Sequence, residues 1–358
     1  MKLKSFWHLI WNDKKYRTVF IICACAAFFI VVGAVAAKYY TKKPGTVAQN
    51  AKKTAVSQKV VSLLDGMSYT NDLANRHPLA VSVENHPDAR PQSGLNKASI
   101  IYETMTEGGI TRFLVIYGPN DAKEIGPIRS ARLYFMDWVK EYDGFFAHAG
   151  GNEDALNNID TYQIKNLDDS KTYFYRDYKG RSVASEHTLY SSTSKLYDYA
   201  KSKGFDINSS SFEALKFKTD GPADNPGKSA EINFSSASYK VNWNFDPNKN
   251  IYLRSLAGTP HKDRDSGEQL STKNIVIQTV QRTLQPTGSY GSNNYVYNNV
   301  GSGQAYVLRD GKVIKGTWKK TSRDSRTKFY DESGVEIQFN PGPTWYEVIP
   351  PDISPTFS

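Results

Sequence analysis

The feature that most constrains this chain is a run of nineteen uncharged residues near its amino end, from Val19 to Ala37. At ~1.5 Å of rise per residue, a helix of that length just crosses the ~30 Å hydrocarbon core of a membrane. Lysines and arginines lie on both sides of the run. We therefore predict one transmembrane helix at residues 19–37, which anchors the rest of the chain.

A cleaved signal peptide is the alternative to a retained anchor, because Ala34-Val35-Ala36 has the small-x-small form of a cleavage site. The apolar run is longer than the ~7–15 residues usual for such peptides, so we favour the anchor. The short segment 1–18 is predicted to be a cytoplasmic tail. The large part of the chain is then extracytoplasmic, and the protein is a single-pass protein of the cell membrane.

The positive charge of the chain is concentrated before residue 65. Residues 1–64 carry 11 basic residues against one acidic residue, whereas residues 65–358 carry 34 against 35. A nearly neutral body argues against a nucleic-acid partner. Both cysteines, Cys23 and Cys25, lie inside the apolar run, so the body has no disulfide, thiol nucleophile or thiolate metal site.

The pattern after the anchor predicts an α/β or α+β fold in two subdomains, with a mixed sheet in the first and mostly strands in the second. The two subdomains either stay separate or share one core. The predicted segments are a stalk at 38–75, an N-terminal α/β subdomain at 76–216, a linker at 217–238, a β-rich C-terminal subdomain at 239–350 and a tail at 351–358.

Three apolar runs at 79–83, 99–105 and 113–117 are predicted strands, because β-branched and aromatic residues dominate them. Polar residues follow each run. Later in the chain, Asp310-Gly311 predicts a tight hairpin and residues 336–339 predict a strand. Sites of α/β proteins usually lie at strand ends near glycine, so we expect the loops between Glu84 and Gly151 to form one pocket.

The chain contains several distinctive motifs: PLAV (78–81), ENHPDARPQSGL (84–95), EGGITRF (107–113), GPIRSAR (126–132), HAGG (148–151), HKD (261–263), AYVLRDGK (305–312) and NPGPTW (340–345). Through these motifs it resembles the YerB-like lipoproteins, a bacterial family with two consecutive domains. The resemblance implies an outer-surface, membrane-tethered protein with a mixed α/β fold, and it supplies no catalytic residue. Members are commonly lipid-anchored through a cysteine, whereas this chain offers a spanning helix.

Two carboxylates, Glu84 and Glu107, are the candidate catalytic residues. Each follows a predicted strand, directly or within a turn, and a pair of carboxylates in a cleft suits glycosidic bond cleavage. The alternative is that these groups form ion pairs with nearby arginines and only hold the loops in place. Whether the protein is an enzyme therefore stays open at this point.

The arginines are candidate ligand-binding residues, namely Arg90, Arg112, Arg129 and Arg132. Guanidinium groups among Gly, Ser and Thr are suited to binding phosphate or carboxylate. We also assign His148, His261 and Asp263 to the candidate ligand site. No metal-binding motif accompanies these histidines, and we predict no metal and no cofactor.

The leading hypothesis is a membrane-anchored envelope protein that binds or remodels a cell-wall polymer, which is either peptidoglycan or an anionic glycopolymer. If the protein is an enzyme, the expected activity is glycan hydrolysis. A non-enzymatic binding or scaffold protein is the first alternative, and a transferase-like protein that binds a phosphate ligand is the second. The expected partners are a cell-wall polymer or a lipid-linked precursor and, through the helix, the membrane. Protein partners are not indicated.

Overall fold

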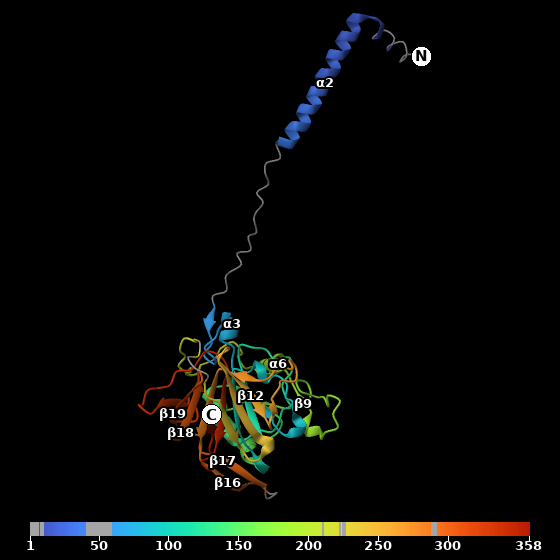
Figure 1. Cartoon of the computed structure of the whole chain (residues 1–358). Helices are drawn as coiled ribbons and strands as arrows, with labels where there is room; N and C mark the ends of the chain where they lie inside the picture. Colours follow the sequence, from blue (N-terminus) through green and yellow to red (C-terminus); the bar gives the residue numbers. More distant parts are fainter. Residues whose placement is uncertain are drawn as a thin grey trace. The chain divides into compact units, whose positions relative to one another are not determined.

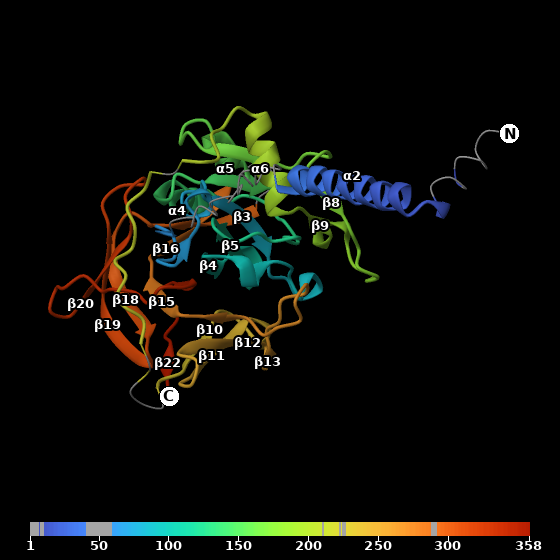
Figure 2. The same ribbon diagram turned by 90° about the horizontal axis from the view of Figure 1, so that it is seen from above.

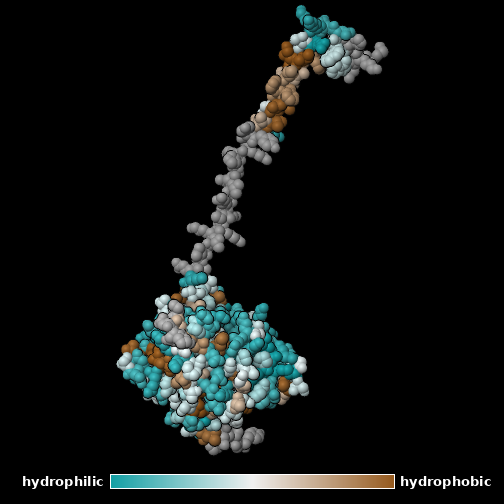
Figure 3. Space-filling model, viewed as in Figure 1, coloured by the Kyte–Doolittle hydropathy of each residue, from teal (hydrophilic) through white to brown (hydrophobic). Residues whose placement is uncertain are grey.

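The computed structural model describes residues 7, 11–40, 59–209, 211–221, 223, 227–287 and 292–358. It divides into two compact units, Met1–Ser57 and Gln58–Ser358. In the first unit, helix α2 (Lys14–Tyr40) is the long helix near the amino end in Figure 1, and Figure 3 colours much of its surface as hydrophobic. By length and composition, Lys14–Lys38 is a candidate membrane span. Residues 1–6, 8–10 and 41–58, parts of the predicted tail and stalk, lie outside the described residues.

The second unit begins earlier than the predicted subdomain boundary at residue 76. Strands β1 (Val60–Val61) and β2 (Ser68–Tyr69) and helix α3 (Asn71–Ala74) lie within the predicted stalk. Asp65 between the two strands is buried and accepts a hydrogen bond from Ser99 Oγ at 2.9 Å. Residues 59–75 therefore belong to the folded body, because Asp65 is buried there and bonded to Ser99, the residue before β4.

A ten-stranded sheet forms the centre of the body in the part of the chain that the structure describes. Both halves of the sequence contribute to it, so the two predicted subdomains share one core. In order, its strands are β20 (Lys328–Asp331), β19 (Lys312–Lys320), β18 (Gly301–Arg309), β15 (Asn274–Thr279), β21 (Thr344–Ile349), β4 (Ile100–Met105), β5 (Thr111–Tyr117), β3 (Leu79–Glu84), β6 (Phe145–His148) and β7 (Lys165–Asp168).

The sheet is mixed, and the directions of its strands decide where the loops meet. Strand β5 is antiparallel to both of its neighbours, β3 and β4, which therefore point the same way. Strands β6 and β7 continue parallel to β3, and β21 and β15 continue parallel to β4. The carboxyl ends of these six strands thus lie along one edge, together with the first residues of β5.

A second sheet, of six strands within the described residues, packs on one face of the large sheet. Figure 2 shows its strands as a separate layer beside β3, β4 and β5. Trp243 and Tyr252 of this sheet share a core with Val81 and Val115 of the large one. The strands are β13 (Thr259–Pro260), β12 (Ile251–Leu256), β11 (Lys240–Asp246), β10 (Ala230–Asn233) and β22 (Thr356–Phe357), with β14 (Ser271–Thr272) paired to β12.

Helices cover the parts of the large sheet that the second sheet does not cover. Helix α6 (Thr193–Ser202) packs on the same face, beside β3 and β7. Helices α4 (Leu133–Glu141) and α5 (Glu153–Asn158) and the hairpin β16–β17 (282–287 and 292–297) lie on the opposite face. The body is therefore an α+β structure, and the predicted fold class is confirmed.

Three segments differ in detail from the sequence prediction. The predicted linker 217–238 contains β10, because Ala230 and Ile232 alternate with polar residues and bury their side chains. The predicted tail 351–358 contains β22, which pairs with β10. The predicted strand at 336–339 forms only two isolated bridges. Glu336 pairs with Tyr330 and Phe339 pairs with Phe217, so the chain changes its partner within these four residues.

Candidate anion-binding site

The alternation of side chains along the strands sends neighbouring polar residues to opposite faces of the large sheet. Glu84 follows Ala80 and Ser82 on the face that α4 covers, and Arg112 lies opposite Glu84 in register. Glu103 alternates with these residues and lies on the face that the second sheet covers. Glu84 and Arg112 therefore belong to one cluster, and Glu103 belongs to another on the opposite face.

The first cluster, which we call the arginine cluster, contains Arg112, Arg129 and Arg132 with the carboxylates of Glu84 and Glu107. Arg129 Nε lies 3.0 Å from Glu84 Oε1 as an ion pair. Arg132 donates to both oxygens of Glu107, from Nε at 2.9 Å and from Nη2 at 2.6 Å. These residues meet at the edge of the sheet where β3 and β4 end and β5 begins, and Arg129 of this set lines a cavity.

Arg112 differs from the other two arginines because no carboxylate lies within ion-pair distance of it among the described residues. Its side chain is buried, its Nη1 donates to the Ser130 carbonyl at 3.1 Å, and its Nε has no partner in that same set. Burial, followed by the charges of Arg132 and Arg129, lowers the pKa of Arg112 to about 9. At neutral pH it therefore remains a cation, and the negative charge of Glu107 acts on it from beyond ion-pair distance.

The two candidate catalytic carboxylates are both held by arginine. Burial raises the pKa of Glu107, but the hydrogen bonds and the charge of Arg132 outweigh burial, so the net pKa is lowered. Glu84 is buried between Arg129 and His187, whose Nδ1 lies 2.8 Å from Glu84 Oε2. A general acid for glycoside cleavage needs a raised pKa, so this arrangement does not favour acid catalysis by Glu107.

A cavity of about 240 Å³ opens beside the arginine cluster, with Arg129 and Arg176 in its wall. A second cavity of about 490 Å³ shares Asp169, Arg176 and Leu189 with it, so the two form one groove. The side chain of Arg129 is about a quarter exposed. A ligand in this cavity that carries an anionic group contacts the cluster through Arg129, the member that lines the wall.

The second cluster, which we call the Arg254 network, lies on the other face and is closed to solvent. Arg254 of β12 donates to Glu103 Oε2 of β4 and, from Nη1 at 2.9 Å, to Glu347 Oε1 of β21. All three side chains have no exposed surface. The guanidinium also lies 4.4 Å from the ring centre of Trp345. The network ties the second sheet to the large sheet.

Burial, followed by the charge of Glu103, raises the pKa of Glu347 well above its usual value. His261 accepts a hydrogen bond from Arg254 Nε at 3.0 Å, and its Nε2 faces Gln92 Oε1 at 2.8 Å. Burial, followed by the charges of Arg254 and Arg90, lowers the pKa of His261 well below its usual value. A neutral His261 is therefore a fixed part of the network.

The remaining predicted site residues lie outside the arginine cluster and form hydrogen bonds with nearby side chains or backbone groups. Arg90 bonds Asn85 and stacks on Tyr239, 5.0 Å from its ring centre. Asp263 caps a turn through the amide of Asp265 at 3.0 Å. His148 is buried near the cluster, and its nitrogens face the Gly150 carbonyl and Asn166 Oδ1 at 2.8 and 2.7 Å.

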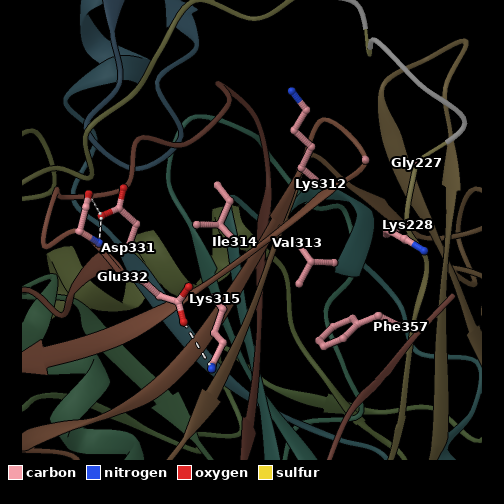
Figure 4. Close-up of a pocket in the computed structure, with 11 residues that line it drawn as sticks. Gly227, Lys228, Lys312, Val313, Ile314, Lys315, Asp331, Glu332 and Phe357 are labelled. Atoms are coloured by element: carbon pink, nitrogen blue, oxygen red, sulfur yellow. Dashed lines mark hydrogen bonds and ion pairs between the residues drawn. The ribbon is translucent and has the colours of Figure 1, made fainter.

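A larger open groove of about 970 Å³ lies in the second half of the chain, and none of the predicted site residues lines it. Figure 4 shows Lys315 paired with Glu332 there, at 3.3 Å, and Phe357 on the opposite wall. Its titratable groups come from exposed strand and turn positions. We therefore place the candidate site at the arginine cluster and not at this groove.

Sequence reasoning assigned none of the three charged members of the Arg254 network, Arg254, Glu103 and Glu347, to a site. Each is a single charged residue inside a short apolar strand, in IIYETM, IYLRSL and TWYEVI. A lone charge at such a position predicts a buried partner of opposite sign. The partners lie 93 and 151 residues apart in the chain, so the pattern does not say which residues pair.

Comparisons with known proteins agree with this architecture. Residues 64–206 match a domain family described as protein of unknown function (DUF3048), N-terminal domain, and residues 230–346 match its C-terminal domain. YerB of Bacillus subtilis (strain 168), named as a candidate lipoprotein, is 29% identical over 344 residues, which cover 94% of this chain and 96% of YerB.

The crystal structure of the YerB protein from Bacillus subtilis superposes with a TM-score of 0.74 at 27% sequence identity, over 84% of this chain and 100% of that one. The two DUF3048 domains together span most of the folded body. The predicted resemblance is thereby confirmed. The chain belongs to the DUF3048 family of YerB-like proteins.

Proposed function

We propose that this chain is a membrane-tethered protein of the bacterial envelope whose folded body binds anionic groups of a cell-wall polymer or of a lipid-linked precursor. The binding site is the arginine cluster, and binding requires no chemical step. Phosphate and carboxylate groups are the ligand chemistry that guanidinium groups recognise.

The observation that carries this proposal is the unpaired charge of Arg112. A buried cation without a counter-ion costs several kcal/mol in folding free energy, in order of magnitude, unless a partner compensates it. Arg129 and Arg132 already use the carboxylates of Glu84 and Glu107. An anionic ligand supplies the charge that the described residues around Arg112 do not.

The groove beside the cluster supports a ligand that is part of a larger molecule. Its two cavities, of about 240 and 490 Å³, have room for a phosphate or carboxylate group with a neighbouring sugar or glycerol unit. Its walls carry the cations Arg129, Arg176 and Lys171 together with the carboxylates of Asp169 and Glu186. A ligand with both anionic and hydroxyl or ammonium groups, such as a unit of an envelope polymer or a lipid-linked phosphate, suits this mixed lining.

The tether is proposed from two observations. Helix α2 is a candidate span, and the relative YerB is named as a lipoprotein, which is a membrane-attached class. We propose a single pass, with the amino end in the cytoplasm and the body on the outer side. A reporter enzyme that is active only outside the cytoplasm, fused after Ser358, is expected to be active, and an inactive fusion overturns this topology.

Co-sedimentation of the full chain in detergent with purified cell-wall sacculi tests the binding proposal. We expect the chain to sediment with sacculi that keep their anionic polymers and to stay soluble with sacculi from which these polymers were extracted. Arg112→Met is expected to abolish sedimentation, and Arg264→Met, at a half-buried arginine outside the cluster, is the matched control. Equal sedimentation of wild type and Arg112→Met contradicts the proposal.

The same samples test the hydrolase alternative. Muropeptide profiles of the sacculi are expected to stay unchanged with both wild type and Glu107→Gln. New fragments that appear with wild type and disappear with Glu107→Gln would instead support glycan cleavage.

A further inference from the structure

We propose that the loops after β3 hold a second site, which binds a divalent transition metal through His86, Asp88 and His187. One ligand atom from each residue lies within 4.8 Å of the ligand atoms of the other two. Nothing in the sequence indicates this site, because His86 and His187 are 101 positions apart. The fold alone brings them together.

Two short turns position these residues. His86 precedes the turn η1 (Pro87–Ala89), which also carries Asp88 and follows β3 directly. His187 closes the turn η4 (Ser185–His187). The two imidazole rings are stacked, with their centres 4.7 Å apart. Both histidines therefore come from segments tied to the rigid edge of the large sheet.

A buried carboxylate fixes the state of His187. Glu84 lies beside the Arg129 cation and accepts a hydrogen bond from His187 Nδ1 at 2.8 Å. A proton on Nδ1 leaves the lone pair of the ring on Nε2. Histidines that bind metals commonly donate their second nitrogen to a carboxylate in this way, which orients the ring and increases its basicity.

The other described histidines lack a nitrogen that is available for a ligand. Both ring nitrogens of His77, His148 and His261 lie within hydrogen-bond distance of carbonyl, amide or guanidinium groups. Within the described residues, only His86 and His187 have a ring nitrogen without a hydrogen-bond partner. Those two are also the histidines that lie next to each other.

The chemistry of the ligand set defines the class of metal. Two imidazoles and one carboxylate suit Zn²⁺, Ni²⁺, Co²⁺ or Fe²⁺, whereas Mg²⁺ and Ca²⁺ prefer oxygen ligands throughout. The side chain of His86 is 32% exposed and that of Asp88 is 56% exposed. Metal ions reach the site from solvent, and coordination positions stay open for water or another ligand.

Binding requires one local rearrangement. His86 Nδ1 accepts a 3.2 Å hydrogen bond from the Asp88 amide, and its ring lies flat on that of His187. The ring of His86 must turn so that both imidazoles point at one ion. Because His86 is partly exposed, this movement involves a single side chain and exchanges one long hydrogen bond for a metal bond.

Glu84 connects this site to the arginine cluster, since it contacts both His187 and Arg129. The metal site is nevertheless argued from its own three ligands. The metal-site proposal does not depend on anion binding, which requires Arg112. A test with metal alone therefore separates the two proposals.

Calorimetric titration of ZnCl₂ into the full chain in detergent tests this inference, with protein that carries no polyhistidine tag. We expect one equivalent of Zn²⁺ to bind, and Co²⁺ to give a visible absorption band that Zn²⁺ removes. His86→Ala and Asp88→Asn are expected to weaken binding by at least about tenfold, and Glu84→Gln by about 10–100-fold through loss of ring orientation.

Asp72→Asn, at an exposed carboxylate of α3, is the control and is expected to bind Zn²⁺ like wild type. His86 and Asp88 are partly exposed, so these variants keep the fold, which circular dichroism checks. Absence of Zn²⁺ binding by wild type overturns the proposal. So does binding that His86→Ala and Asp88→Asn leave unchanged.

Discussion

Two groups of arginines and carboxylates lie on opposite faces of the large sheet, and they differ in how their charges are balanced. In the Arg254 network, one cation bonds two carboxylates, no side chain is exposed, and burial raises the pKa of Glu347. In the arginine cluster, Glu84 and Glu107 each pair with one arginine, and Arg112 is left without a carboxylate among the described residues.

The difference separates a structural role from a binding role. A closed network contributes to stability only as a complete set, and the removal of one member leaves an uncompensated charge. A cluster with one unpaired buried cation is less stable alone than with an anion. The same residue types can therefore hold two sheets together on one face and attract a ligand on the other.

Arg254→Met is expected to have the largest effect on stability. It leaves Glu103 and Glu347 buried without their cation and also removes the stacking on Trp345. We expect a loss of about 3–5 kcal/mol in the free energy of unfolding, measured by denaturant titration. A loss of less than about 1 kcal/mol would mean that the network does not hold the sheets together.

The raised pKa of Glu347 predicts a pH dependence. A raised folded-state pKa contributes stability that is fully present below the unfolded value, near 4.5, and is lost as pH rises through the folded value. Wild type should therefore lose stability relative to Glu347→Gln as pH rises above about 4.5, by up to ~1.4 kcal/mol per pH unit. Unfolding titrations of both proteins across this range check it, and parallel curves would contradict it.

Glu107→Gln should show the opposite pH dependence, with a smaller effect. Arg132 lowers the folded pKa of Glu107 against the effect of burial, so its contribution is present above about pH 4.5 and is lost as pH falls through the folded value. We expect Glu107→Gln to cost about 1 kcal/mol of unfolding free energy at neutral pH. The cost should vanish in acid, and a cost that grows as pH falls would refute the assignment.

Arg112→Met is expected to have the smallest effect on stability. Methionine fills a similar volume and removes a buried cation that no described carboxylate balances, so the unfolding free energy should stay within about 1 kcal/mol of wild type or rise. Denaturant titration beside Arg254→Met gives the comparison directly. Similar large losses for both variants would show that Arg112 belongs to a closed structural network.

The sequence predicted the elements around these clusters better than the clusters themselves. Local patterns predicted β3, β4 and the hairpin at Asp310-Gly311, where both residues have positive φ. The arginine cluster was also predictable in part, because its loops follow strands that are close in the sequence. All five of its members were among the candidate residues.

Long-range pairing was not predictable. Strand β21 inserts between β15 and β4, which joins the two halves of the chain in one sheet, and no local pattern specifies that neighbour. The same insertion brings Glu347 to Glu103 and Arg254. Side chains alternate between the two faces along each strand. That Glu84 and Glu103 lie on different faces of the sheet follows only when the register between their strands is known.

The most direct test of the central claim compares the thermal unfolding of full-length wild type and Arg112→Met in detergent, with and without inorganic phosphate at constant ionic strength. A ligand that binds only the folded state stabilises that state. If Arg112 is a cation that binds an anion, phosphate therefore raises the Tm of wild type and leaves the Tm of Arg112→Met unchanged. Equal shifts in both proteins, or no shift in wild type, would contradict the account.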